Sequence, residues 1–134
     1  MAAMKSMRYG IALLLAACLP LAPAAGTENE AAISQAELME VLASGQAPAL
    51  IDVRTPEEFQ SGHIPGAINI PLQSLPRRVN ELAAYQDREL VLYCEVGGRA
   101  ARGGSWLASR GFRQVRLLDG HMSAWRGAGL PTER

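Results

Sequence analysis

The stretch Glu89-Leu90-Val91-Leu92-Tyr93-Cys94-Glu95-Val96-Gly97-Gly98-Arg99 decides the fold of this chain. After Glu89 it begins with a continuous apolar run, which is typical of a strand buried on both faces of a parallel sheet. Two glycines follow, and residues 100–109 then have the pattern of a helix. A strand that passes through a short loop into a helix is the unit from which α/β folds are built.

The same pattern continues on both sides of this stretch. Three further strands are predicted from apolar runs at 49–53, 67–70 and 114–118. Capping boxes, in which Ser or Thr is followed three residues later by Glu, predict helices that begin after Ser34 and Thr55. A third predicted helix begins at Pro76 and continues through Leu82. Because strands and helices alternate, the sequence predicts an α/β fold with a mostly parallel central sheet and helices on both faces.

Length and charge narrow the class of protein. The chain has 134 residues, of which 49% are hydrophobic, so it is long enough for one domain with a core of its own. Without Lys5 and Arg8 near the N-terminus, 11 basic residues remain against 13 acidic ones. The remaining arginines do not form a basic stripe, and four of them are expected on a solvated surface: Arg102, Arg110, Arg113 and Arg116. No nucleic-acid partner is therefore predicted.

The N-terminal segment has the order of features found in a secretory signal peptide. Two basic residues precede an apolar stretch at 9–21, and Ala22-Pro23-Ala24 offers the small residues of a cleavage site. The apolar stretch is too short to span a bilayer. We expect residues 1–24 to be a signal peptide, 25–33 a linker, 34–131 the folded domain and 132–134 a tail. The expected location is the periplasm of a bacterium or outside the cell.

Cys18 allows an alternative for this segment. Leu15-Ala16-Ala17-Cys18 is similar to a bacterial lipobox, in which the cysteine is lipid-modified and anchors the protein to a membrane. The apolar run continues beyond Cys18, however, and this favours ordinary cleavage after Ala24. In that case Cys94 is the only cysteine of the mature chain, and no internal disulfide can form.

The loop after Cys94 has the features that stabilise a thiolate. Gly97 and Gly98 allow successive backbone N–H groups to point inward, and a helix N-terminus follows. Arg99 adds a full positive charge. These features predict a pKa of Cys94 below the usual value of about 8.5, without help from a neighbouring histidine. With two histidines and one mature cysteine, neither a metal site nor a cofactor is expected.

Three segments together resemble the rhodanese-like family, and the resemblance covers roughly residues 34–131. The loop matches the pattern Cys-x-x-Gly-x-Arg at Cys94–Arg99. The upstream signature corresponds to Ile51–Phe59 and Gly62–Ala67, and the closing segment to Gly111-Phe112, Leu118, Gly120 and Trp125. The resemblance implies a rhodanese-like fold and a single-domain sulfurtransferase.

The resemblance also implies a chemistry for these residues. Cys94 would take a sulfane sulfur from a small-molecule donor such as thiosulfate and pass the resulting persulfide sulfur to cyanide or a thiol. The residues that would bind the substrate, mainly through backbone amides and the Arg99 side chain, are Glu95, Val96, Gly97, Gly98 and Arg99. Asp52 and Arg54 would form a charge pair that supports the site rather than takes part in the reaction.

The length of the loop and three departures from the family's pattern refine this expectation. Four residues lie between Cys94 and Arg99, whereas phosphatases and arsenate reductases of this fold have five, so the loop favours sulfur over phosphate. Glu95 would repel a dianionic donor, Ala100 replaces a common serine, and His121 replaces the second glycine of a Gly-Gly pair. An alternative is therefore a persulfide carrier or binding module with little thiosulfate turnover.

Overall fold

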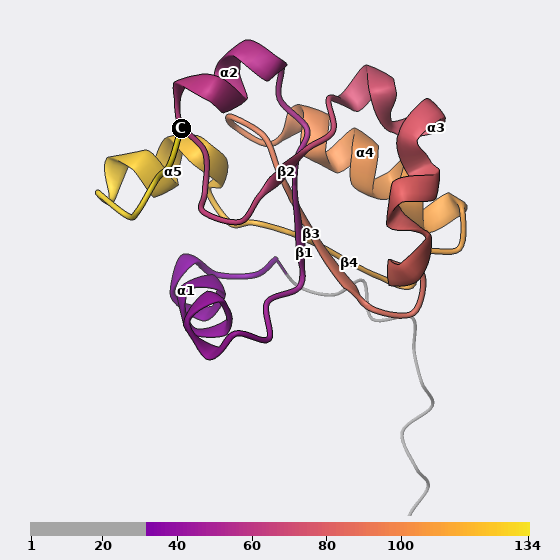
Figure 1. Cartoon of the computed structure of the whole chain (residues 1–134), viewed down its shortest axis with the longest axis horizontal. Helices are drawn as coiled ribbons and strands as arrows, with labels where there is room; N and C mark the ends of the chain where they lie inside the picture. Colours follow the sequence, from indigo (N-terminus) through magenta and orange to yellow (C-terminus); the bar gives the residue numbers. More distant parts are fainter. Residues whose placement is uncertain (1–31) are drawn as a thin grey trace, which may run out of the picture.

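The computed structural model describes residues 32–134 (Figure 1). The predicted signal peptide, Cys18 and most of the predicted linker lie outside this range. Within it the elements follow in the order α1 (Gln35–Ser44), β1 (Ala49–Asp52), α2 (Pro56–Ser61), β2 (Ile68–Asn69), η1 (Leu72–Ser74), α3 (Leu75–Arg78), η2 (Val79–Tyr85), β3 (Glu89–Tyr93), α4 (Gly98–Ser109), β4 (Gln114–Leu117) and α5 (His121–Gly127).

The four strands form one parallel sheet in the order β2-β1-β3-β4. The two central strands, β1 and β3, are buried almost throughout, as their continuous apolar sequences predict. Asp52 at the end of β1 pairs in register with Tyr93 at the end of β3. The carboxyl ends of these strands therefore place residue 54 next to the loop that follows residue 93.

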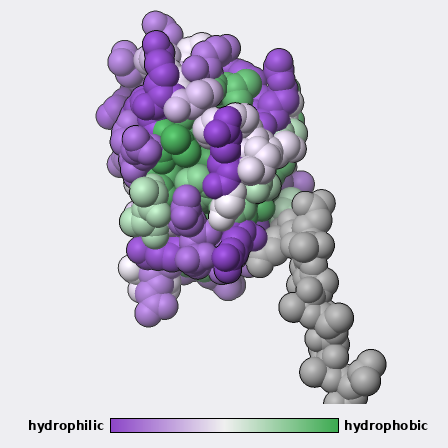
Figure 2. Space-filling model, turned by 90° about the vertical axis from the view of Figure 1, so that its right-hand side faces the viewer, coloured by the Kyte–Doolittle hydropathy of each residue, from purple (hydrophilic) through white to green (hydrophobic). Residues whose placement is uncertain are grey.

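Helices cover both faces of the sheet, as the sequence predicts (Figure 1). On one face Ile51 and Leu92 pack with residues of α3, η2 and α4. On the other face Leu50 and Val91 pack with residues of α1 and α5, including the fully buried Trp125. Adjacent residues of each strand point to opposite faces, so each strand contributes to both cores. The face turned to the viewer in Figure 2 is hydrophobic near its centre and mainly hydrophilic around it.

Several elements differ from the sequence prediction. Helix α5 is missing from the sequence prediction. It has only seven residues, with Gly120 before it and Gly127 at its end, so its sequence shows no helical period. The helix predicted from Pro76 begins one residue earlier and continues from Val79 as a 3₁₀ helix. The strand predicted at 67–70 forms only at Ile68–Asn69.

Both predicted helix caps form, but only one is a complete capping box. At α2 the Thr55 hydroxyl accepts the N–H of Glu58, and the Glu58 carboxylate accepts the N–H of Thr55. At α1 the Ser34 hydroxyl accepts the N–H of Glu37 at 3.1 Å, while the Glu37 carboxylate binds Arg116 at 2.7 and 3.0 Å instead. Arg116 of the edge strand β4, expected on a solvated surface, is thus largely buried against α1.

The C-terminal residues pack back onto the domain. Glu133 forms an antiparallel bridge with His63, and its carboxylate accepts the N–H of Gly66 at 3.0 Å. The His63 ring stacks on Phe59 with centroids 3.6 Å apart, and its Nδ1 lies 2.9 Å from the Phe59 carbonyl oxygen. Among residues 32–134, no helix is both long and apolar enough to cross a membrane.

Candidate active site

Cys94 lies where β3 ends, at the edge of a parallel sheet where α/β proteins bind ligands. The residue is only 1% exposed, and its carbonyl oxygen accepts the N–H of Met122 at the start of α5. The loop then turns within three residues into α4, which begins at Gly98. Cys94 is the only free cysteine among the described residues.

Backbone N–H groups converge on the sulfur of Cys94. Sγ accepts the N–H of Gly97 at 3.1 Å and that of Ala100 at 3.4 Å. The two donors belong to the first turn of α4 and the residue before it, where the helix dipole favours negative charge. Ala100 therefore supplies its hydrogen bond from the main chain, and the absence of a serine hydroxyl leaves this contact intact.

The pKa of the Cys94 thiol falls from 9.0 to about 7, although burial alone would raise it. The lowering comes from the side chain of His121 first and then from the N–H groups of Ala100 and Gly97. The sequence expectation of a low pKa agrees with this, but the expectation that no histidine takes part is wrong.

This pKa predicts how fast Cys94 reacts with iodoacetamide as the pH changes. Only the thiolate reacts, so the rate should rise with pH and reach half its maximum near pH 7. The urea-unfolded chain is the control, because the field of the loop is absent there and the midpoint should lie close to the ordinary thiol value. A folded-state midpoint as high as that of the unfolded chain would contradict the loop geometry.

Arg99 makes its main contacts with Glu58 rather than with the thiol. Its guanidinium donates to both Glu58 carboxylate oxygens, at 2.7 and 2.9 Å. These hydrogen bonds hold the pKa of Glu58 at about 2 and raise the pKa of Arg99. The negative charge of Cys94 also raises the pKa of Arg99, but by less than Glu58 does. The positive charge expected at the end of the loop is therefore largely offset by a carboxylate from α2.

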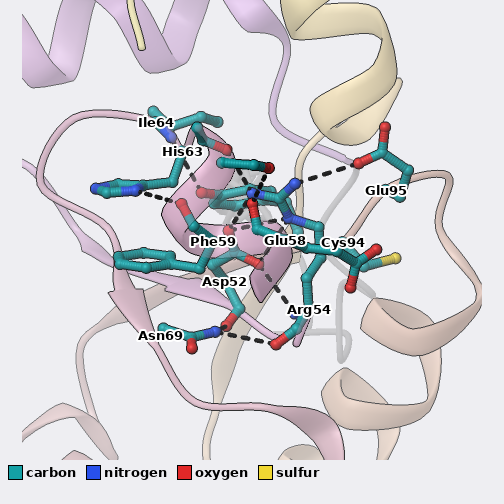
Figure 3. A network of polar contacts seen from close by, with 12 residues as sticks. Asp52, Arg54, Glu58, Phe59, His63, Ile64, Asn69, Cys94 and Glu95 are labelled. Carbon is teal, nitrogen blue, oxygen red and sulfur yellow. Dashed lines mark hydrogen bonds and ion pairs between the residues drawn. The ribbon is translucent and has the colours of Figure 1, made fainter. Parts of the chain in front are cut away.

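Asp52 and Arg54 form a buried ion pair beside the loop (Figure 3). Arg54 is 1% exposed and Asp52 is fully buried, and their Nη2 and Oδ2 atoms are 2.8 Å apart. Arg54 Nε also lies 3.1 Å from each Asp52 oxygen, and Nη2 donates to the Gly62 carbonyl oxygen at 2.8 Å. The pair thus connects the end of β1 with the turn after α2.

Glu95 lies between two arginines. Arg126 of α5 donates to it at 2.7 Å. Arg54 donates from the buried side at 3.3 Å, as Figure 3 shows. Arg126 and then Arg54 lower the pKa of Glu95, so its carboxylate is ionised but its charge is offset. The repulsion of a dianion expected from Glu95 is correspondingly weakened. Val96, the next residue, is 79% exposed at the tip of the loop.

His121 completes the set of residues around the thiol. Its ring is buried, and Nδ1 accepts the backbone N–H of Cys94 at 3.3 Å. A Cβ atom on Gly97 would lie only 2.9 Å from His121 Nε2, which explains why position 97 holds glycine. In the sequence, the one signal of this contact is a histidine where the resemblance expects a second glycine.

Comparison with known proteins agrees with this geometry. The model of the rhodanese-like domain matches residues 34–128. A sulfurtransferase of Allochromatium vinosum is 35% identical over 99 residues, which cover 74% of this chain and 91% of that protein. An HTH-type transcriptional regulator of Mycobacterium tuberculosis is 43% identical over 109 residues, which cover 78% of this chain but only 45% of the regulator.

A solved structure gives the same result for the fold. The crystal structure of a thiosulfate sulfurtransferase from Pseudomonas aeruginosa matches with a TM-score of 0.72 and 30% identity. The match covers 78% of this chain and 20% of that one. By its sequence and its fold, this chain belongs to the rhodanese-like domain family, and sulfurtransferases are among its relatives.

Proposed function

We propose that the protein is an exported sulfurtransferase that moves a sulfane sulfur from a donor such as thiosulfate to cyanide or a thiol through a persulfide on Cys94. One observation carries the proposal: the sulfur of Cys94 lies at a strand end and accepts two backbone N–H groups. A nucleophile stabilised as an anion in this way needs no separate general base. The sulfurtransferase relatives support the reaction class.

The reaction has two displacement steps. In the first, the Cys94 thiolate attacks the sulfane sulfur of thiosulfate, and a bond forms between Sγ and that sulfur. The bond between the two thiosulfate sulfurs breaks, and its electron pair leaves with sulfite. In the second, cyanide or a thiolate attacks the outer persulfide sulfur, and the electron pair of the S–S bond returns to Cys94. Both steps conserve charge and require no oxidant or reductant.

The first step can be tested apart from the second. We expect the protein, after addition of thiosulfate without an acceptor, to gain one sulfur atom by intact mass and to release one equivalent of sulfite. Subsequent addition of cyanide should remove that sulfur as thiocyanate. If thiosulfate neither adds mass nor releases sulfite, the proposed donor is wrong.

A second candidate function is that of a persulfide carrier with little thiosulfate turnover. The pairing of charges around the loop favours it, since Arg99 binds Glu58 and Glu95 binds both Arg54 and Arg126. Little positive charge is then left to attract a dianion. A carrier would acquire sulfur on Cys94 from a protein persulfide or glutathione persulfide, while thiosulfate would leave its mass unchanged.

Replacement of Glu95 with glutamine tests this balance of charges. The change leaves Arg126, which is about half exposed, without its carboxylate partner beside the loop. We expect the KM for thiosulfate to fall about threefold at low ionic strength, and the gain to disappear near 1 M salt because the exposed charge is then screened. Steady-state kinetics at the two salt concentrations would measure both effects.

Glu40→Gln is the matched control, because this carboxylate is exposed on α1 and lies in a different part of the sequence and fold. It should leave the KM unchanged at both salt concentrations. An equal fall in KM for the two variants would show that net charge, rather than the position of Glu95, controls donor binding.

Export is the part of the proposal that rests on sequence alone. Residues 1–24 have the features of a signal peptide, and Cys18 offers lipid modification as the alternative. The intact mass of the protein recovered from its native host distinguishes a chain that begins after Ala24 from one that begins at a lipid-modified Cys18. A full-length mass would contradict both forms of export.

A further inference from the structure

His121 has a backbone conformation that side chains rarely adopt. Its φ is 53°, and it is the one non-glycine residue with positive φ among residues 32–134. It follows Gly120, whose φ is 74°. Such strained residues persist where the surrounding structure fixes them, and they concentrate at functional sites. The residue that would avoid the strain, glycine, is the one that the family resemblance expects here.

This conformation carries the His121 ring under the Cys94 loop. The ring is 8% exposed, and its Nδ1 atom accepts the N–H of Cys94. Its Nε2 atom lies against Gly97, at the point where a Cβ would come within 2.9 Å. The ring therefore touches both the backbone of the nucleophile and the residue whose N–H donates to Sγ.

The hydrogen bond from Cys94 also defines the tautomer that a neutral ring adopts. A nitrogen that accepts a hydrogen bond carries no proton, so a neutral ring has its proton on Nε2. This N–H group lies on the side of the ring that faces the loop. A doubly protonated ring would instead direct an N–H at the N–H of Cys94 and lose that hydrogen bond. The geometry thus leaves Nε2 as the donor nitrogen, next to the backbone of Gly97.

The other charged groups near the loop bind one another. Glu95 of the loop pairs with Arg126 of α5 and Arg54. Arg54 pairs with Asp52 at the end of β1, and Arg99 of α4 pairs with Glu58 of α2. Within residues 32–134, His121 is the titratable side chain that makes a hydrogen bond to Cys94.

We propose that His121 is a positioning residue for sulfur transfer, which holds the backbone of Cys94 through Nδ1 and stabilises the anionic sulfur through Nε2–H. The proposal rests on the proposed role of Cys94 as the nucleophile. It adds a side chain from α5 to a loop that otherwise stabilises the anion through its own backbone. A histidine at this position would make the enzyme active at lower pH than a glycine would.

Two substitutions separate the two contacts. His121→Gly removes both and suits the positive φ. His121→Asn also tolerates that conformation and places an oxygen near the position of Nδ1, but has no atom in place of Nε2. In both variants the midpoint of iodoacetamide alkylation of Cys94 should rise, with a rate at pH 6 roughly tenfold below wild type and little difference above pH 9. At pH 9, kcat should be lower for the glycine variant than for the asparagine variant.

Alkylation does not depend on sulfur transfer, so this test and the failure of the proposed function are distinguishable. Thermal unfolding of each variant shows that it is folded, and a role in packing alone would lower the Tm without moving the midpoint. A midpoint at the wild-type pH in either folded variant overturns the proposal. Because two residues suited to this backbone are used, loss of folding in one leaves the other as the test.

Discussion

Replacement of Cys94 with serine should reduce the formation of thiocyanate from thiosulfate and cyanide by at least about 10³-fold. A serine hydroxyl stays protonated at neutral pH, and its oxygen cannot form the S–S bond on which the transfer depends. The loop N–H groups of Gly97 and Ala100 would still find an acceptor of similar position. The effect should therefore fall on the chemical step rather than on the fold.

The measurement is the initial rate of thiocyanate formation at saturating thiosulfate, with thermal unfolding of the same samples. We expect a Tm close to that of the wild type, since the substitution keeps the size of a side chain that is only 1% exposed. A serine variant that retained a tenth of the wild-type rate would show that the transfer does not depend on a persulfide on Cys94, the free cysteine of the described residues.

The central part of the fold could be predicted because its signals are local. The runs at 49–53 and 89–93 contain too few polar residues for a half-exposed strand, and the structure buries both. The complete capping box at Thr55 depends on residues only three positions apart. Helix α5 has no such signal, since its stability comes from Met122 and Trp125 packing on the sheet.

The contacts of the site also fall into two groups: those that local sequence predicts and those that it does not. The cysteine, the glycines and the helix start are neighbours in the chain, so their convergence on Sγ follows from local geometry. The partners of the charged residues are distant in sequence: Arg99 binds Glu58, and Glu95 binds Arg126. The place of His121 against Cys94 depends on how α5 docks at the end of β3. Composition and spacing carry no information on these contacts.

The second large effect concerns stability. Asp52→Ala should lower the free energy of unfolding by about 3–5 kcal/mol, because it leaves the Arg54 cation buried without its closest partner. Glu95 lies farther from Arg54, at 3.3 Å, and it is shared with Arg126. Urea unfolding followed by circular dichroism would measure the loss. Glu81→Ala is the control: its ion pair with Arg78 is exposed, and its removal should have a much smaller effect.

A double variant separates the charge from the packing. If the cost of Asp52→Ala arises from an unpaired cation, then Asp52→Ala with Arg54→Met should be more stable than Asp52→Ala alone, since no buried charge remains. A double variant that is less stable would show that the Arg54 contacts with the Gly62 carbonyl oxygen and Glu95 outweigh the buried charge. Comparison of the double variant with the wild type then measures what the intact pair contributes to stability. If the two are equally stable, the remaining role of the pair is to hold Glu95, the first residue after Cys94, against the end of β1 through Arg54.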